Sequence, residues 1–557
     1  MRTRAIIYLF FFFLTASVQA RQTQIPPKYE FRGVWIATVN NIDWPRNRFD
    51  NTDKQKRDFR VILNKLKSNG INAVVVQVRA AADAFYQSPY EPWSEWLTGK
   101  QGKAPVPFYD PLKFMIEESH KRGMEFHAWL NPYRAVTNTN SSNIHSSHIT
   151  KLKPNWFLKF GTLKIFNPGL PAVRRYITEI VADIVRRYKV DGIHFDDYFY
   201  PYPSAEFKLK DDYTFYNNRN GFKRKADWRR ANVDALIRDV HYAIEEINPK
   251  VKFGISPYGV WRNSNMSSLG SRTTSGLTSY DHLHADTRLW LEKGWVDYIS
   301  PQLYQNTKHK KNSYLELVRW WSKNNFGRHI YVGHAVYRIF EKKSFGWNSF
   351  KEMPYQVRHL RKFSSVLGSV FYNSKALLNN KGNFKDSLRL DFYKFPALAP
   401  PMPWKDATAP LAPDSVHVSN NIKNIRLEWD VPIPAKDGEL PNRYIVYRFE
   451  NDEPVNIQNP TNIISIQSAK KRYFVDSDVF DANNYSYIVT SLDLLNNESE
   501  LPFGPPIKTQ VRTKPKVIIP FDSSKPISKN YPFSYEEAEF FYKLMMKSSR
   551  DYLGVSE

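Results

Sequence analysis

The sequence predicts a (β/α)8 barrel followed by a small all-β domain, and three observations support this. Between residues 29 and 398, eight apolar strand patterns are each followed by a helical pattern, which is the count for such a barrel. Several strand patterns, such as 72–79, are continuous apolar runs, typical of parallel strands covered on both faces. From residue 410 the chain changes to short alternating strands. A doubly wound sheet is the alternative for the first region, but no Gly-rich phosphate turn follows an early strand.

The elements of the first region follow from apolar periodicity and from start and stop residues. The helix expected at 53–69 has an apolar face and ends before Gly70, and the helix at 171–188 begins with Pro171. The expected strands cover 31–37, 72–79, 124–130, 190–196, 251–256, 296–303, 329–335 and 366–372. The expected helices cover 53–69, 110–122, 171–188, 226–248, 285–293, 313–324, 350–363 and 383–393.

The two ends of the chain are expected to lie outside the barrel. Residues 1–20 resemble a secretory signal peptide, with Arg2 and Arg4, an apolar run and a small-x-small cleavage site. An uncleaved membrane anchor is the alternative, although the apolar run is short for a span. We therefore expect export to the periplasm or cell envelope, or secretion. Residues 515–557 are basic and then amphipathic, and predict a docking helix or a loose tail.

Residues 399–409 are Pro-rich and predict a linker. Beyond it, residues 410–514 contain strand patterns separated by turns, the clearest at 425–429, 443–448 and 485–492. Short strands over this length predict a β-sandwich. The Trp429 strand and the two Tyr-rich strands resemble a fibronectin type III module.

The composition limits the partners. The chain has 557 residues and a formal net charge of +25, which predicts attraction to an anionic polymer or surface. Because export is expected, nucleic acid is not an expected partner, and acidic glycans, cell-wall polymers or the anionic envelope surface fit better. Aromatic residues make up 15% of the chain, enough to stack on sugar rings, and the absence of cysteine excludes disulfides and thiolate metal sites. The oligomeric state is left open.

The strongest catalytic candidates are two adjacent acids at the end of the fourth strand. Active sites of such barrels lie at the carboxyl ends of the strands, where Asp196 and Asp197 follow a buried run. Strand alternation puts His194 and Asp196 on one side, so Asp196 is the first candidate and Asp197 the second. Glycoside cleavage needs two carboxyl groups. The partner of Asp196 is left open among Asp197, Asp83, Asp286 and two further acids, Glu91 and Glu95.

Other strand-end residues are candidates for substrate binding, because amides, guanidinium groups and aromatic rings suit carbohydrate. They are Arg79, Trp93, Trp96, Asn131, Tyr133, Arg134, His194, Tyr258, Trp261, Gln302 and Tyr304. No cofactor is expected. No metal is expected either, because the close histidine pairs His145/His148 and His282/His284 lack acids at ligand spacing.

The strand-end motifs also carry a family resemblance. They are Phe31-Arg32-Gly33-Val34-Trp35, Gln77-Val78-Arg79-x-x-x-Asp83, Ala128-Trp129-x-Asn131-Pro132-Tyr133-Arg134, Asn167-Pro168-Gly169, Asp191-Gly192-Ile193-His194-Phe195-Asp196-Asp197-Tyr198, Gly254-Ile255-Ser256-Pro257 and Asp297-Tyr298-Ile299-x-Pro301-Gln302-Leu303-Tyr304. Together, over about residues 29–395, they resemble the glycosyl-hydrolase-like 10 family.

The resemblance implies a bacterial envelope or secreted glycosidase, and one characterised kind of member acts on peptidoglycan glycan strands that have lost their stem peptides. The fourth strand is also similar to that of retaining barrel glycosidases, whose nucleophile follows an inward polar residue by two positions, as Asp196 follows His194. The acid/base residue is not implied. We therefore expect an exported glycoside hydrolase acting on a cell-wall polysaccharide. The alternatives are an inactive glycan-binding barrel, because no Glu follows the fifth strand, and a cell-wall esterase or deacetylase.

Overall fold

The computed structural model describes residues 25–140, 143–341, 346–420, 424–450, 453–479, 484–502 and 506–510. Within them, the predicted barrel is confirmed: eight parallel strands close in the order β1-β11-β10-β9-β8-β7-β3-β2. The barrel strands are β1 (Phe31–Ile36), β2 (Ala73–Arg79), β3 (Glu125–Leu130), β7 (Gly192–Phe195), β8 (Lys252–Ile255), β9 (Tyr298–Ile299), β10 (His329–Ala335) and β11 (Val366–Tyr372). Each lies within its predicted range. The largest shortening is at β9, because Pro301 has no N–H to continue the ladder.

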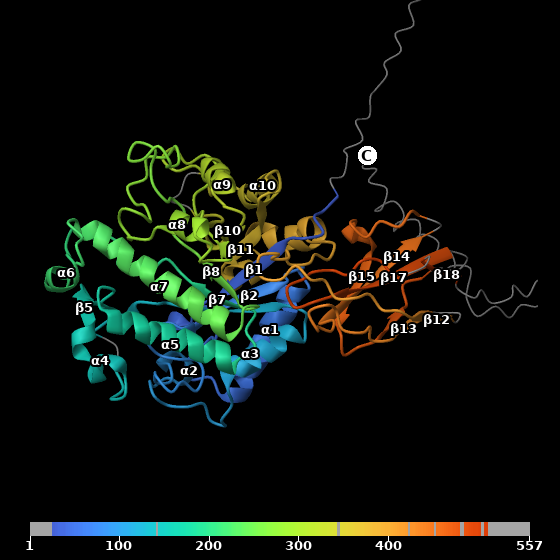
Figure 1. The fold of residues 1–557 in the computed structure, drawn as a ribbon, viewed down its shortest axis with the longest axis horizontal. Coiled ribbons are helices and arrows are strands. Elements are labelled where there is room, and N and C mark those ends of the chain that lie inside the picture. Colours follow the sequence, from blue (N-terminus) through green and yellow to red (C-terminus); the bar gives the residue numbers. More distant parts are fainter. Residues whose placement is uncertain are drawn as a thin grey trace, which may run out of the picture. The chain divides into compact units, whose positions relative to one another are not determined.

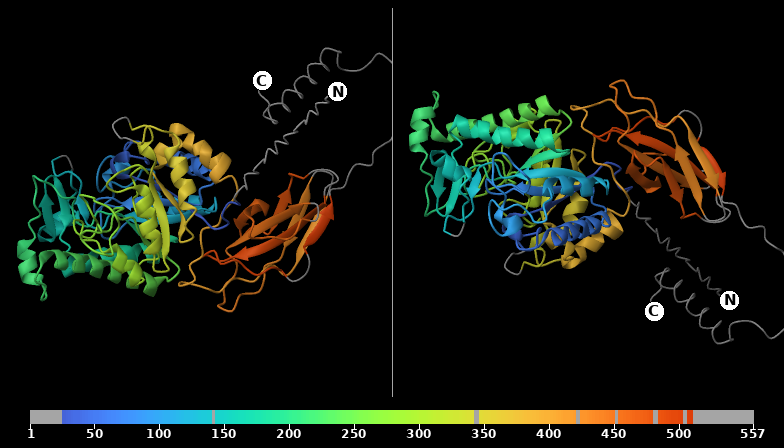
Figure 2. Two further views of the ribbon diagram at one scale, coloured as in Figure 1. Left: turned by 90° about the horizontal axis from the view of Figure 1, so that it is seen from above. Right: turned by 90° about the horizontal axis from the view of Figure 1, so that it is seen from below.

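Helices surround the barrel strands, and α5 and α7 pack side by side (Figures 1 and 2). The outer helices are α1 (Thr52–Lys67), α3 (Pro111–His120), α5 (Pro171–Arg187), α7 (Lys225–Ile247), α8 (Thr287–Glu292), α9 (Tyr314–Lys323), α10 (Glu352–Leu360), α12 (Phe384–Ser387) and the π-helical η5 (Leu388–Phe392). Local chemistry sets their starts. The Asn51 side chain accepts from the backbone N–H of Lys54 at α1, and Asp110 accepts from that of Lys113 at α3.

The long loops at the carboxyl end contain structure that the sequence patterns did not predict. After β3 the chain forms a three-stranded antiparallel sheet in the order β4-β6-β5. The elements in these loops are η1 (Val39–Asn41), α2 (Glu95–Thr98), β4 (Arg134–Val136), α4 (Ile149–Leu152), η2 (Pro154–Trp156), β5 (Phe157–Phe160), β6 (Leu163–Phe166), α6 (Asp212–Asn218), η3 (Val336–Arg338), α11 (Ser374–Leu378) and η4 (Lys381–Asn383). Strands of three or four residues are too short to give a clear alternation.

Aromatic rings fill the interior of the barrel. Phe31 and Tyr331 stack with their centroids 4.1 Å apart, and Tyr298 lies against both. The Tyr298 ring occupies the space above Gly254, so that a Cβ on Gly254 would lie 1.9 Å from the ring. Because interiors are close-packed, only glycine fits beside this ring.

Replacing Gly254 with alanine is therefore expected to destabilise the barrel by about 3 kcal/mol, the upper end for an overpacked core. Urea unfolding of the purified protein measures the change. The matched control is Gly276→Ala, because a Cβ at Gly276 meets no other atom within 4 Å. Equal stability of the two variants would contradict the close packing of Tyr298 on Gly254.

The C-terminal part of the described chain is all-β, as predicted. Its elements are β12 (Val416–Asn420), β13 (Ile425–Trp429), β14 (Arg443–Glu450), η6 (Pro460–Asn462), β15 (Ile463–Ser468), β16 (Tyr473–Asp476), β17 (Asn484–Leu492) and β18 (Ile507–Gln510). They form two antiparallel sheets, β12-β13-β16 and β15-β14-β17-β18. Trp429 packs on Tyr444 in the core between them. The fibronectin type III likeness and the limits of the linker at 399–409 stay predictions.

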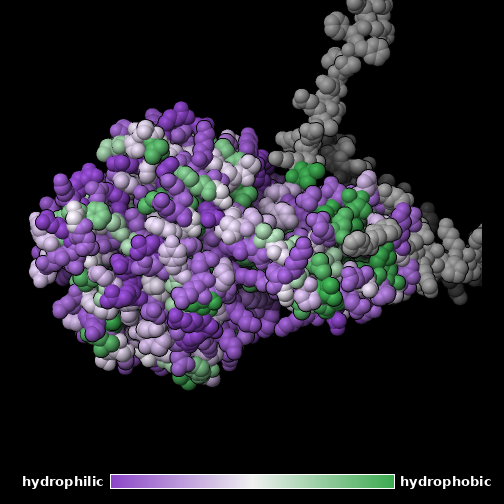
Figure 3. Space-filling model, viewed as in Figure 1, coloured by the Kyte–Doolittle hydropathy of each residue, from purple (hydrophilic) through white to green (hydrophobic). Residues whose placement is uncertain are grey.

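The visible barrel face is mainly hydrophilic, whereas apolar residues gather over the all-β part (Figure 3). Among the described helices, none combines the length and apolar character that crossing a membrane requires. The predicted signal peptide at 1–20 and tail at 515–557 lie outside the described residues.

Candidate active site

The two adjacent acids lie at the carboxyl end of the barrel, directly after β7. Asp196 and Asp197 are both buried, and 3% of the surface of each remains exposed. The ladder is still intact at this point, because the backbone N–H of Ser256 donates to the carbonyl of Phe195 at 2.8 Å. The acids are thus carried by a rigid strand end rather than by a free loop.

Three N–H donors hold Asp196. Trp129 Nε1 donates to Oδ2 at 3.1 Å, Asn131 Nδ2 donates to the same oxygen, and the backbone N–H of Tyr198 donates to Oδ1 at 3.2 Å. None of these groups can accept a proton in return.

The orientation of the Asn131 amide is fixed from behind. Its Oδ1 accepts from Gln77 Nε2 at 2.6 Å and from Arg134 Nη2 at 2.8 Å, so that Nδ2 faces Asp196. Gln77 is fixed in turn, because its Oε1 accepts from the backbone N–H groups of Thr38 and Val39. This network crosses from β1 through β2 and β3 to β7.

Asp197 has a different set of partners. Gln302 Nε2 donates to Oδ1 at 3.1 Å, and the hydroxyl of Tyr202 donates to Oδ2. Gln302 also donates to the carbonyl of Ser256 at 2.9 Å, which fixes its amide beside the end of β8. Unlike the partners of Asp196, a hydroxyl can reverse and accept a hydrogen bond.

The environment favours one shared proton on the pair. Burial, with Arg134 opposing it and the neighbouring Asp197 adding to it, raises the pKa of Asp196 to about 7, and burial also raises the pKa of Asp197. Two carboxyl groups this close ionise in two separate steps that belong to the pair. One carboxylic acid and one carboxylate therefore coexist over a pH range whose upper end lies near the pKa of Asp196.

The activity at this site is expected to fall as the pH rises above about 7, where the pair loses its last proton. Below that pH the acid is present, and activity declines again only where the second carboxyl group becomes protonated. The dependence of kcat/KM on pH, measured from about pH 4 to about pH 9, tests this. A rate that keeps rising above pH 7 would contradict a role for the retained proton.

Several residues predicted to contact substrate are buried and bond to other parts of the protein, and their contact with substrate stays a prediction. Arg79 is fully buried and forms a bidentate ion pair with Glu91, with N–O distances of 2.8 and 2.6 Å. Tyr133 is buried. His194 lies beneath the acids, where its Nε2 accepts from Trp35 Nε1 at 3.3 Å and its Nδ1 contacts the hydroxyl of Tyr298 at 3.0 Å. Its pKa is well below the usual value because it is buried.

Two of the predicted stacking residues are also covered. Trp261 stacks on Trp320 with centroids 5.7 Å apart, and its Nε1 donates to Asp286. The guanidinium group of Arg48 lies 4.0 Å from the ring centroid of Trp96. Both rings are therefore packed against other side chains of the protein. These contacts join residues that are far apart in the chain, so the sequence positions alone could not predict them.

Of the six remaining predicted contacts, Asn131 is buried beside Asp196 and the other five are partly exposed. The five are Trp93, Arg134, Tyr258, Gln302 and Tyr304. Arg134 lies over the Tyr198 ring, 5.0 Å from its centroid, and Tyr304 packs with Tyr337 and Tyr372. The predicted set omitted Tyr198, Tyr202 and Tyr372. The first two follow a predicted strand and Tyr372 is the last residue of one, and each carries a ring suited to sugar.

The other acids at this end of the barrel are engaged in holding the fold. Asp286 caps α8 by accepting from the backbone N–H of Leu289 at 3.2 Å. Asp83 accepts from the backbone N–H of Ala81 at 3.1 Å, and Glu95 pairs with Arg48 at 2.9 Å. Asp43 accepts from the backbone N–H groups of Ala37 and Lys375. The structure thus favours structural roles for Asp83 and Asp286, which we predicted as catalytic candidates.

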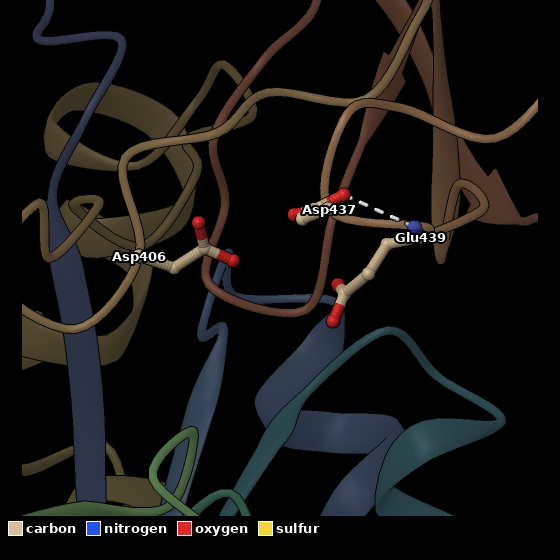
Figure 4. A group of neighbouring side chains, drawn as sticks. All are labelled: Asp406, Asp437 and Glu439. Atoms are coloured by element: carbon tan, nitrogen blue, oxygen red, sulfur yellow. Dashed lines mark hydrogen bonds between the residues drawn. The ribbon is translucent and has the colours of Figure 1, made fainter.

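Only one group of acids in the described part of the chain has the spacing to hold a metal ion. It comprises Asp406, Asp437 and Glu439, shown in Figure 4. The ammonium group of Lys250 contacts both Asp406 and Glu439, so two of the three carboxylates already pair with a cation of the protein. We assign no metal site to these residues.

Comparison with known proteins identifies the family. The glycosyl hydrolase-like 10 family model matches residues 30–348. Glycosyl hydrolase YngK of Bacillus subtilis is 40% identical over 477 residues, which cover 85% of this chain and 92% of that protein. This chain belongs to the glycosyl hydrolase-like 10 family.

A further relative, equally similar in sequence, is glycosyl hydrolase DigH of Escherichia coli K12. It is 40% identical over 328 residues, covering 56% of this chain and 74% of that protein. Among solved structures, the PgaB (BpsB) glycoside hydrolase domain from Bordetella bronchiseptica aligns with a TM-score of 0.43 and 12% identity, over 67% of this chain and 100% of that domain. Membership of the family supports a glycosidase-type function and a polysaccharide substrate.

Proposed function

We propose that this protein is an exported glycoside hydrolase that cleaves O-glycosidic bonds in a cell-wall polysaccharide, with peptidoglycan glycan strands as the favoured substrate. The observation that carries the proposal is the pair of carboxyl groups at the end of β7, each held by its own set of donors. One member supplies a proton to the leaving oxygen, and the other, as a carboxylate, stabilises the positive charge that develops on the sugar.

Substrate recognition in this proposal uses the partly exposed groups around the pair. Arg134 and Gln302 supply N–H donors for hydroxyl or carboxylate groups, and Tyr198, Tyr258 and Tyr304 supply rings that cover the apolar faces of sugars. The net charge of +25 favours association with an anionic glycan or envelope surface. Export rests on the signal-like residues 1–20.

The test uses the protein from residue 21 and glycan strands stripped of their stem peptides by an amidase. New reducing ends and fragments of defined mass are expected with the wild-type protein and not with Asp196→Asn. The control is Asp239→Asn, because Asp239 pairs with Arg174 on the outer helices. Hydrolysis unchanged in Asp196→Asn would remove Asp196 from the mechanism.

A second candidate is a glycan-binding barrel without catalysis. It is favoured by the end of β8, where Ser256, Pro257 and Tyr258 stand in place of a catalytic acid. Binding of the stripped strands without turnover, by the wild-type protein and by Asp196→Asn alike, would support this candidate over the hydrolase.

A further inference from the structure

The structure offers two catalytic carboxyl groups at one place, rather than two that face each other across a substrate. A retaining glycosidase with an enzyme nucleophile has its two carboxyl groups about 5–5.5 Å apart on opposite sides of the sugar, and an inverting enzyme about 6.5–9.5 Å apart. Asp196 and Asp197 are neighbours in the chain at the end of a single strand. Their carboxyl groups therefore lie at one strand end rather than on two strands that face each other across the barrel mouth.

Five other acids at the carboxyl end each bond to another part of the protein. Glu91 is committed to Arg79, Glu95 to Arg48, and Asp286 to the first turn of α8. Asp43 is tied to two backbone N–H groups, and Asp83 accepts from the backbone N–H of Ala81. The nucleophile must then come from somewhere other than a third carboxylate.

We propose that the nucleophile is the carbonyl oxygen of a 2-acetamido group on the substrate itself, so that the site is specific for 2-acetamido sugars. This inference rests on the proposed glycosidase function and defines its substrate class and the role of each acid. Substrate-assisted cleavage needs one acid to protonate the leaving oxygen and one carboxylate to hold the acetamido N–H. Because the acetamido oxygen itself attacks opposite the leaving oxygen, no enzyme nucleophile is needed on that face.

The hydrogen bonds assign the two roles. Burial raises the pKa of Asp196, but its three partners are all obligate N–H donors that favour the charged form, so we place the shared proton on Asp197 and Asp196 acts as the carboxylate. A carboxylate has about four lone-pair sites, which leaves one free for the acetamido N–H. Asp197 is paired with the Tyr202 hydroxyl, which can donate to the carboxylate and accept from the acid. Asp197 can therefore gain and lose a proton without losing this partner, as an acid/base requires.

The reaction then runs in two balanced steps. In the first, the acetamido oxygen forms a bond to the anomeric carbon while the bond to the leaving oxygen breaks, and that oxygen takes the proton of Asp197. The product is an oxazolinium ion whose N–H is held by Asp196. In the second, water attacks the anomeric carbon, its proton returns to Asp197, and the bond to the acetamido oxygen breaks. The sugar leaves with its acetamido group restored and its anomeric configuration retained.

The decisive experiment compares three forms of the same stripped glycan strands: N-acetylated, de-N-acetylated, and re-acylated with trifluoroacetyl groups. The N-acetylated form is expected to be cleaved. The free amine cannot supply a carbonyl oxygen, and the electron-poor trifluoroacetyl oxygen is a weaker nucleophile, so kcat/KM should fall at least about 100-fold for both. Binding of each form, measured separately, shows whether the loss lies in catalysis.

A second measurement uses the thiazoline derived from N-acetylglucosamine, a stable ring that mimics the oxazolinium ion. Competitive inhibition of the wild-type protein is expected, with binding at least about 10-fold weaker to Asp196→Asn, because an amide cannot replace the carboxylate opposite a cationic ring. The Asp239→Asn variant is expected to bind as the wild type does.

The outcomes separate the two proposals. Equal cleavage of the acetylated and de-N-acetylated strands, or inversion of the anomeric configuration, would overturn the substrate-assisted mechanism while leaving the glycosidase intact. Cleavage of none of the three forms would overturn the proposed function itself. Cleavage confined to N-acylated strands, with inhibition by the thiazoline, supports both.

Discussion

Replacing Asp197 with asparagine is expected to lower kcat by about 10²–10⁴-fold, the usual contribution of a general acid/base. An amide has the same shape and can still bond to Gln302, but it cannot deliver a proton to the leaving oxygen. Substrates with a good leaving group, such as aryl glycosides of the same sugar, should lose much less. Steady-state kinetics on both kinds of substrate measure the difference.

Three further variants test whether the loss in Asp197→Asn comes from the missing proton donor. Asp196→Asn is expected to lose activity on both kinds of substrate, because the carboxylate is needed whatever the leaving group. Tyr202→Phe should retain more activity than Asp197→Asn, since it removes only the group that bonds to the acid. Asp239→Asn serves as the unaffected control. Equal losses for Asp197→Asn on good and poor leaving groups would exclude Asp197 as the proton donor.

Replacing Glu91 with glutamine is expected to lower the free energy of unfolding by about 3–5 kcal/mol, because Arg79 would remain buried without a compensating charge. Both side chains of this pair are fully buried. Burial lowers the pKa of Arg79 and the charge of Glu91 raises it. In the Glu91→Gln variant the raising effect is lost, but a guanidinium keeps its proton in proteins, so Arg79 cannot escape the cost by losing its charge. Urea unfolding at neutral pH measures the change.

The matched control is Glu95→Gln, since Glu95 pairs with Arg48 in the same loop but keeps solvent exposure. That change is expected to cost less than about 1 kcal/mol. A double variant, Arg79→Met with Glu91→Leu, should be more stable than Glu91→Gln alone, because it leaves no buried charge unpaired. Equal stability of Glu91→Gln and Glu95→Gln would show that burial of the Arg79–Glu91 ion pair does not add to the cost of breaking it.

Much of the fold was accessible from the sequence because its signals are local. Apolar runs such as 72–79 indicate parallel strands by themselves, and Asn51, Asp110 and Gly70 mark helix boundaries through bonds to nearby residues. The small sheet after β3 was missed for the same reason, since its strands are too short for a periodic signal. The partial loss of β9 follows from the local effect of Pro301 on the ladder.

The site was only partly accessible. The position of Asp196 and Asp197 followed from the strand pattern, because catalytic side chains of a barrel lie where its strands end. Their partners could not be predicted, since Trp129, Asn131 and Gln302 reach the acids from other strands and the direction of each side chain depends on packing. Arg79 is a further example. Its position at a strand end suggested substrate binding, but in the structure it is buried in an ion pair with Glu91.

The sequence by itself determined the closed barrel, the all-β region and the acidic pair at the end of the fourth strand, because periodicity and strand ends are properties of neighbouring residues. Only the tertiary structure decided which acids are free for chemistry, because that depends on hydrogen bonds between residues far apart in the chain. It assigned Asp83, Glu91 and Asp286 to structural bonds and gave Asp196 and Asp197 different partners. The distinction between a fixed carboxylate and a proton donor arises from those partners.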